Sequence, residues 1–132
     1  RRKVILDRAG GAAPELVAVV TEASLMYRWG TRDERRAQVT HLVEMGRRPN
    51  IDLRLLRFTD GPHPGMSSLI SIFDFPGDEP SMVYLENEVA IQEVNDQSAV
   101  DAYSAIFGRI VGAALDTPAT TAHLKQLAET LE

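Results

Sequence analysis

The sequence predicts an α+β fold: a small mixed, mainly antiparallel sheet of about five strands with one crossover helix and two C-terminal helices. Three observations support this prediction. A strand-like run, a capped helix and a second strand-like run follow one another early in the chain. Three more short runs rich in β-branched and aromatic residues come next, joined by short connections. Two segments with the apolar periodicity of a helix complete the chain.

The first three elements predict a strand–helix–strand crossover. Residues 16–21 form a β-branched run that is typical of a buried strand. Thr31 and Glu34 have the spacing of a capping box, and the helix that they begin is predicted to end at Gly46. Residues 50–55 alternate with period two before the apolar pattern switches face, which indicates a strand with a bulge or with two covered faces. A crossover helix of this length favours parallel pairing of the two strands.

The middle of the chain predicts an antiparallel meander. Residues 60–65 are dense in turn formers and indicate a stiff loop. Strands are predicted at 68–75, 82–86 and 88–94, with a tight turn at Asn87 between the last two. Because the connections are short, successive strands are predicted to pair antiparallel.

The last part of the chain predicts two helices. From Val100 onward, apolar side chains recur at three- and four-residue steps, which indicates an amphipathic helix with a narrow apolar seam. Thr117 and Pro118 predict the cap and the first position of a final helix. Gly108 and Gly112 lie one helical turn apart and would allow another helix to approach closely, either within the chain or in a dimer.

Composition limits the classes of function. The chain has 132 residues, enough for one domain, and 44% of them are hydrophobic, so a packed core is expected. It has no cysteine, which excludes disulfides, thiolate chemistry and Cys-ligated metals. A net charge of −5 would repel nucleic-acid phosphates, so this region is not expected to hold DNA itself. No membrane span or secretory signal is recognisable, and a cytoplasmic location is expected.

Residues 1–132 are expected to form a single effector or partner-docking domain, because no linker-like stretch divides them. The chain begins with Arg1 rather than methionine, and residues 1–8 read as the middle of a charged helix. The domain is therefore expected to be cut from a longer chain.

The sequence contains no pattern typical of catalysis or metal binding. Its three histidines, His41, His63 and His123, lack the spacing of metal ligands, and there is no nucleophile elbow or phosphate-binding loop. No enzymatic activity, cofactor or metal is therefore expected.

The best candidate site is the polar segment that follows the first predicted strand, since strand ends and helix starts often carry ligand groups. A carboxylate among aromatic and arginine side chains could bind a small polar ligand or a partner peptide. The structural alternative is that Glu22 pairs with an arginine and Trp29 plugs an edge of the core. Glu86 is a candidate binding residue only if a pocket lies against the predicted meander. The candidate ligand- or partner-binding residues are Glu22, Tyr27, Arg28, Trp29, Arg32, Arg35 and Glu86.

Six segments resemble one family in the same order and spacing. They are Thr-Glu-Ala-Ser-Leu at 21–25, Gln-Val-Thr-His-Leu-Val-Glu-Met at 38–45, Arg-Pro-Asn-Ile at 48–51, His-Pro-Gly-Met at 63–66, Phe-Asp-Phe-Pro at 73–76 and Val-Tyr-Leu-Glu at 83–86. With these segments the chain resembles the C-terminal domain of WhiJ-like, antitoxin-like regulators. In that actinobacterial family, a domain of unknown function follows an Xre-type helix-turn-helix.

The resemblance implies a regulatory domain that senses a ligand or docks a partner protein, with DNA bound only by a missing N-terminal domain. The expected partners are a small-molecule effector, a small protein or a second copy of the chain. The family usually has a shorter, less aromatic stretch where residues 26–29 stand, which suits a contact specific to this member. Two alternatives stay open: a dimerisation-only module, and a transferase-like enzyme that uses a strand-end glutamate, Glu22 or Glu86.

Overall fold

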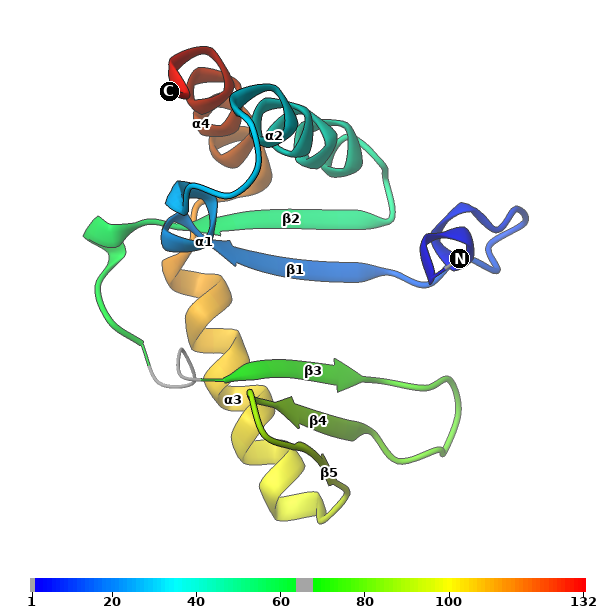
Figure 1. Ribbon diagram of the computed structural model, residues 1–132. Coiled ribbons are helices and arrows are strands. Elements are labelled where there is room, and N and C mark those ends of the chain that lie inside the picture. The colour runs from blue at the N-terminus through cyan, green and yellow to red at the C-terminus, as the bar shows by residue number, and fades with distance from the viewer. Residues whose placement is uncertain (1, 64–67) are drawn as a thin grey trace. The chain divides into compact units, whose positions relative to one another are not determined.

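The structure is a computed structural model that describes residues 2–63 and 68–132 (Figure 1). The α+β class is confirmed, but the prediction of one five-stranded sheet is wrong. The described strands form two sheets, a parallel pair in the order β1–β2 and an antiparallel sheet in the order β3–β4–β5. The chain divides into two compact units: a first unit of Arg1–Asp60 with Ala114–Glu132, and a second unit of Gly61–Ala113. That all 132 residues act as one effector domain stays a prediction.

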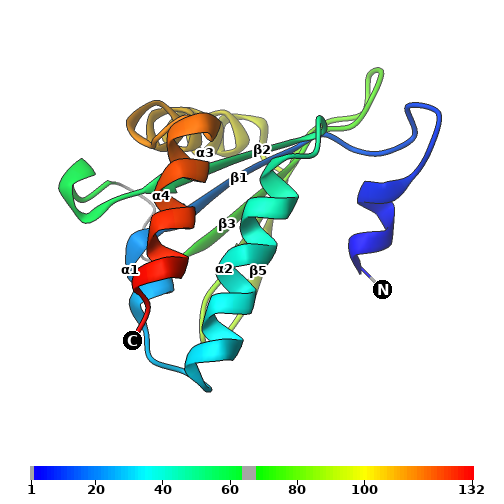
Figure 2. The same ribbon diagram turned by 90° about the horizontal axis from the view of Figure 1, so that it is seen from above.

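The first unit is built on the predicted crossover. β1 (Leu16–Thr21) and β2 (Ile51–Leu56) are parallel, with an uninterrupted register that excludes a bulge. Both faces of β2 are covered at its end, because Leu55 and Leu56 are both buried. The helices of this unit are α1 (Glu22–Met26), α2 (Arg32–Gly46) and α4 (Thr117–Thr130). Figures 1 and 2 show α2 and α4 side by side on one face of the strand pair.

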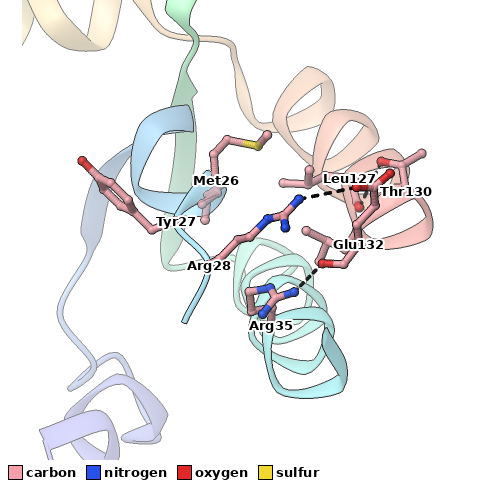
Figure 3. A pocket seen from close by; sticks show the side chains of 9 residues that line it. Met26, Tyr27, Arg28, Arg35, Leu127, Thr130 and Glu132 are labelled. Carbon is pink, nitrogen blue, oxygen red and sulfur yellow. Dashed lines mark hydrogen bonds and ion pairs between the residues drawn. The ribbon is translucent and has the colours of Figure 1, made fainter. Parts of the chain in front are cut away.

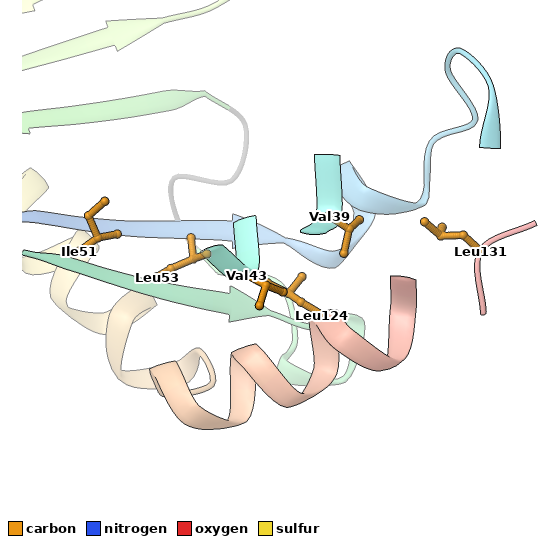
Figure 4. Close-up of a cluster of buried hydrophobic side chains, with 6 residues drawn as sticks. All are labelled: Val39, Val43, Ile51, Leu53, Leu124 and Leu131. Carbon is orange, nitrogen blue, oxygen red and sulfur yellow. The ribbon is translucent and has the colours of Figure 1, made fainter. Parts of the chain in front are cut away.

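Apolar side chains from α2, β2 and the C-terminal part of the chain form the core of the first unit (Figure 4). Leu124 of α4 is completely buried, and removing such a side chain from water stabilises a fold by about 1.5–3 kcal/mol. On α2, Val39 and Val43 lie one turn apart and are both buried, as the predicted apolar face requires. The full buried cluster consists of Val39, Val43, Ile51, Leu53, Leu124 and Leu131.

The start of α4, rather than another strand, closes an edge of β2. In a parallel pair, alternate residues direct their backbone groups away from the partner strand. The Leu55 N–H donates to Oγ1 of Thr120 at 2.9 Å, and the Leu55 carbonyl accepts from the Leu115 N–H at 2.9 Å. Thr120 is 1% exposed, and its hydroxyl donates in turn to the Leu115 carbonyl at 3.3 Å. These bonds occupy the outer edge of β2 at Leu55, so no third strand pairs at that residue.

Helix α4 is capped one residue earlier than predicted. The carboxylate of Asp116, not the hydroxyl of Thr117, accepts the exposed N–H of Ala119 at 2.9 Å. The Thr117 hydroxyl instead donates to Oδ1 of Asp52 on β2 at 2.6 Å. This hydrogen bond lowers the pKa of Asp52 against the opposing effect of its partial burial.

The second unit contains the predicted meander. It consists of β3 (Leu69–Phe73), β4 (Met82–Glu86), β5 (Ile91–Val94) and α3 (Gln97–Ala113), with β4 antiparallel to both neighbours and α3 packed against it. β5 is shorter than the predicted 88–94, because Oδ1 of Asn87 accepts the N–H groups of Val89 and Ala90 at 2.9 and 3.0 Å. Those two amides form a turn and cannot join the ladder. The predicted strand at 68–75 likewise ends early, at Phe73.

Other local predictions have mixed outcomes. The charged segment at the start is a 3-10 helix, η1 (Arg2–Asp7), rather than an α-helix, and a second 3-10 turn, η2 (Phe58–Asp60), follows β2. Of the predicted loop at 60–65, Pro64 and Gly65 lie outside the described residues. Within the second unit, nothing lies within 4 Å of a Cβ built on Gly108 or Gly112, so that pair packs against no helix there. No helix in the described ranges is long and apolar enough to cross a membrane.

Replacing Thr120 by valine is expected to lower the free energy of unfolding by about 1–3 kcal/mol. The side chain keeps its shape, but the Leu55 N–H is left buried without its acceptor. Urea unfolding followed by circular dichroism measures the change. Thr120→Ser is the matched control, because it keeps the hydroxyl and loses only a methyl group. A valine variant as stable as the serine variant would show that the hydroxyl contributes nothing to this edge.

Candidate functional site

An open hollow lies in the first unit where α1, the start of α2 and the end of α4 meet (Figure 3). Its volume is about 190 Å³. Leucine and methionine side chains supply its apolar part, and charged or hydroxyl-bearing side chains supply the rest. The residues that line it are Leu25, Met26, Tyr27, Arg28, Arg35, Leu127, Thr130, Leu131 and Glu132.

One side of the hollow is made by α1, a short helix that the sequence analysis missed. Thr21 caps it: its Oγ1 accepts the Ser24 N–H at 3.3 Å, and the Ser24 hydroxyl donates back to the Thr21 carbonyl at 2.7 Å. This turn folds the chain directly after β1 and packs Leu25 against the core, while Met26 and Tyr27 stay 53% and 71% exposed. The signal that could have revealed it is the Thr-x-x-Ser spacing followed by good helix formers.

The predicted capping box fixes the connection between α1 and α2. Oε2 of Glu34 accepts the Thr31 N–H at 2.7 Å, and the Glu34 N–H donates to Oγ1 of Thr31 at 3.2 Å. The backbone and then the side-chain hydrogen bonds from Thr31 lower the pKa of Glu34. Gly30 is required beside this box: its φ is +56°, and a Cβ there would lie 2.6 Å from Oε2 of Glu34.

Arg35 and Arg36 hold the end of α4 against α2. The Nη1 of Arg35 donates to the carbonyls of Trp29 and Gly30 at 3.0 and 2.9 Å, and its Nη2 donates to the backbone oxygen of Glu132. The Nε of Arg36 donates to the Ala128 carbonyl at 3.0 Å. Cations are favourable at a helix C-terminus, where carbonyls lack intrahelical partners. Arg35 therefore shapes the hollow and has its guanidinium engaged by the backbone.

Arg28 has a different environment from Arg35. Its guanidinium lies 3.5 Å from Oε2 of Glu132, and the two side chains are 78% and 87% exposed. An ion pair so open to water contributes little to stability. A ligand carboxylate or phosphate can therefore replace Glu132 beside Arg28 at small cost.

Glu22 does not line the hollow. Its Oε2 accepts the N–H of Phe58 at 2.8 Å, and its Oε1 lies 3.8 Å from Nε2 of His123. The carboxylate thus ties the start of α1 to η2 and to α4. This arrangement supports the structural alternative for Glu22. The hydrogen bond with Asp60 raises the pKa of Arg57, and the charge of Glu22 helps to raise it by a smaller amount.

The structure brings together three of the seven predicted site residues, Tyr27, Arg28 and Arg35. Trp29 is 47% exposed rather than inserted at the core edge, and Arg32 is exposed at the first position of α2. Glu86 is exposed at the end of β4, in the second unit. A ligand-binding role for any of the seven stays a prediction. Sequence reasoning missed the wall contributed by Leu127, Thr130 and Glu132, because nothing local to those residues indicates that α4 ends beside α1.

Comparison with known proteins gives one family. The model of a family described as Domain of unknown function (DUF5753) matches residues 1–126. No curated protein matches the chain, and no solved structure matches it. The family match spans both units and brings no ligand, substrate or partner with it.

Gly30→Ala is expected to destabilise the protein more than Gly10→Ala. Both glycines have positive φ, which costs an alanine about 1–2 kcal/mol, but a Cβ meets nothing within 4 Å at Gly10. At Gly30 the added methyl must also displace the Glu34 carboxylate, so the pKa of Glu34 is expected to rise toward its ordinary value. Because that pKa is lowered in the folded state, the contribution of Glu34 to stability is lost as pH falls through it. NMR titration of Glu34 and urea unfolding measure both effects, and equal losses in the two variants would contradict the clash.

Proposed function

The chain belongs to the DUF5753 family of domains of unknown function, and we propose that it is the regulatory domain of an Xre-type helix-turn-helix transcriptional regulator. It binds an effector or docks a partner, and binding changes how a separate N-terminal domain of the same cytoplasmic protein engages its operator. The chain itself is not an enzyme in this proposal, and it reaches DNA only through that other domain.

The hollow in the first unit is the observation that carries the proposal. It offers an apolar surface from Met26 and Leu127 and one exposed cation, Arg28, in an ion pair that a ligand can displace. Its volume of about 190 Å³ is smaller than the roughly 300–1,000 Å³ of sites for drug-sized ligands. The hollow therefore suits a small amphipathic effector with an anionic group, or a single side chain of a docked protein.

Exposed side chains beside the hollow favour docking of a protein. Met26, Tyr27 and Trp29 are 53%, 71% and 47% exposed, although each has a large apolar surface. Methionine, tyrosine, tryptophan and arginine are among the side chains enriched at protein interfaces. The segment 26–29 supplies all four.

A route for the signal to the rest of the protein runs through α2. Its N-terminal end is bonded through Arg35 to Glu132 in the wall of the hollow, as described above. At its other end, η1 is held by a hydrogen bond of 2.9 Å between Nζ of Lys3 and Nε2 of His41, and by an ion pair between Asp7 and Arg48. A ligand regulates only if its binding free energy differs between the DNA-competent and incompetent states. Displacing Glu132 from Arg28 is the step that we propose to supply this difference.

The full-length protein is expected to change its affinity for its operator when an extract of small molecules and proteins from its host is added. Arg28→Glu should abolish this response, because it replaces the exposed positive charge of the hollow with a negative one. Arg32→Glu is the matched control, since it makes the same charge change at an exposed position that does not line the hollow. Fluorescence anisotropy of labelled operator DNA measures the affinity.

A second pair of variants tests the aromatic segment. Tyr27→Ala should weaken the response, and Phe58→Ala should not, because Phe58 is a 65% exposed aromatic side chain of the same unit that does not line the hollow. An unchanged operator affinity in every mixture would contradict the regulatory role. If Arg28→Glu and the wild type respond equally, the effector does not bind in this hollow.

A further inference from the structure

The charge of the chain is divided unequally between its two units. The second unit has eight acidic residues and one basic residue, Arg109, which gives it a charge of −7. The first unit has eleven acidic and thirteen basic residues, which gives +2. The net charge of −5 therefore conceals a strongly acidic unit, and a field of one sign selects partners of the opposite sign. The eight acidic residues are Asp74, Asp78, Glu79, Glu86, Glu88, Glu93, Asp96 and Asp101.

Two of these carboxylates lie within an apolar face of the β3–β4–β5 sheet. The strand register places Glu86 between Leu69 and Ile91 in one cross-strand row, and places Glu93 beside Tyr84 in the next. Phe73 follows in a third row and meets Tyr84 edge-on, with ring centroids 5.6 Å apart. Side chains at these alternate positions stand on the same side of the sheet.

This face is open to solvent. Leu69, Phe73 and Ile91 are 60%, 47% and 66% exposed, and Glu86 and Glu93 are exposed as well. On the opposite face Val83 is completely buried, and Ile70, Ile72 and Leu85 are half-buried. Soluble proteins rarely leave several large apolar side chains together on one exposed sheet face unless a partner covers them.

We propose that this face of the second unit binds a basic amphipathic helix of a partner protein. Leu69 and Phe73 are four residues apart on one strand, which spans about 13 Å, and two apolar residues seven apart on a helix span about 10.5 Å. A helix of two to three turns thus covers the stripe. Its lysine or arginine side chains meet Glu86 and Glu93, for which the three strands provide no cation of their own. This surface is separate from the hollow of the first unit and does not depend on the regulatory role proposed for it.

The test uses two synthetic helical peptides and the whole chain. Both peptides have leucines along one face, and the remaining positions are lysine in one and glutamate in the other. The lysine peptide is expected to bind and the glutamate peptide is not. Glu86→Lys and Glu93→Lys should each weaken binding of the lysine peptide about tenfold. Glu79→Lys and Asp101→Lys are the matched controls and should have little effect. They make the same change in net charge at exposed positions outside the three strands.

Apolar variants test the same face without a change of charge. Ile91→Thr should weaken binding of the lysine peptide, and Val89→Thr should not, because Val89 is 94% exposed in the turn before β5. Circular dichroism confirms that each variant is folded. Equal losses from all four lysine substitutions would overturn the proposal, since only net charge would then matter. A dimer in light scattering that Glu93→Lys dissociates would also overturn it, in favour of a second copy of the chain on this face.

Discussion

The hydrogen bonds between Leu55 and the start of α4 are the constraint on which the first unit depends. Thr120 and Leu115 bond the outward N–H and carbonyl of Leu55 in the way that another strand would. They also fix α4 over that sheet beside α2. Because α4 starts at a fixed place, Arg36 meets the Ala128 carbonyl in its last turn, and Arg35 meets the backbone oxygen of Glu132 just beyond it. The hollow is the space left where that end reaches α1.

Two arginines on neighbouring elements have opposite roles in this hollow. Arg35 is bound by three carbonyl-type oxygens, so its guanidinium is part of the scaffold. Arg28 pairs with the carboxylate of Glu132 at 3.5 Å, and both side chains are open to solvent, so the charge of Arg28 remains accessible. The planar, multidentate guanidinium suits both uses. For the ligand-binding role that we propose, a fixed wall and one exposed charge favour selectivity, because the wall is ordered before any ligand binds.

Much of this fold could be predicted from local patterns, and the rest depends on contacts distant in sequence. The capping box at Thr31, the parallel crossover and the antiparallel meander each follow from spacing or turn chemistry within a short window, and all three are present. The division into two sheets was not predicted, and no periodicity encodes the bonds of Leu55 to residues far along the chain. For the site, the segment after β1 indicated Tyr27, Arg28 and Arg35. Glu22 does not line the hollow, because its carboxylate accepts the Phe58 N–H and lies beside His123, and a binding role for it stays a prediction.

The first unit is discontinuous in sequence, whereas the second is one unbroken segment. Because synthesis runs from the N-terminus, residues 61–113 leave the ribosome before α4 does. The second unit can therefore fold while β2 still lacks Thr120 and Leu115 at Leu55. During that interval an unsatisfied strand edge is open to solvent, which is the condition under which nascent chains recruit chaperones or pair wrongly. Leu115 and α4 thus decide when the first unit can complete folding.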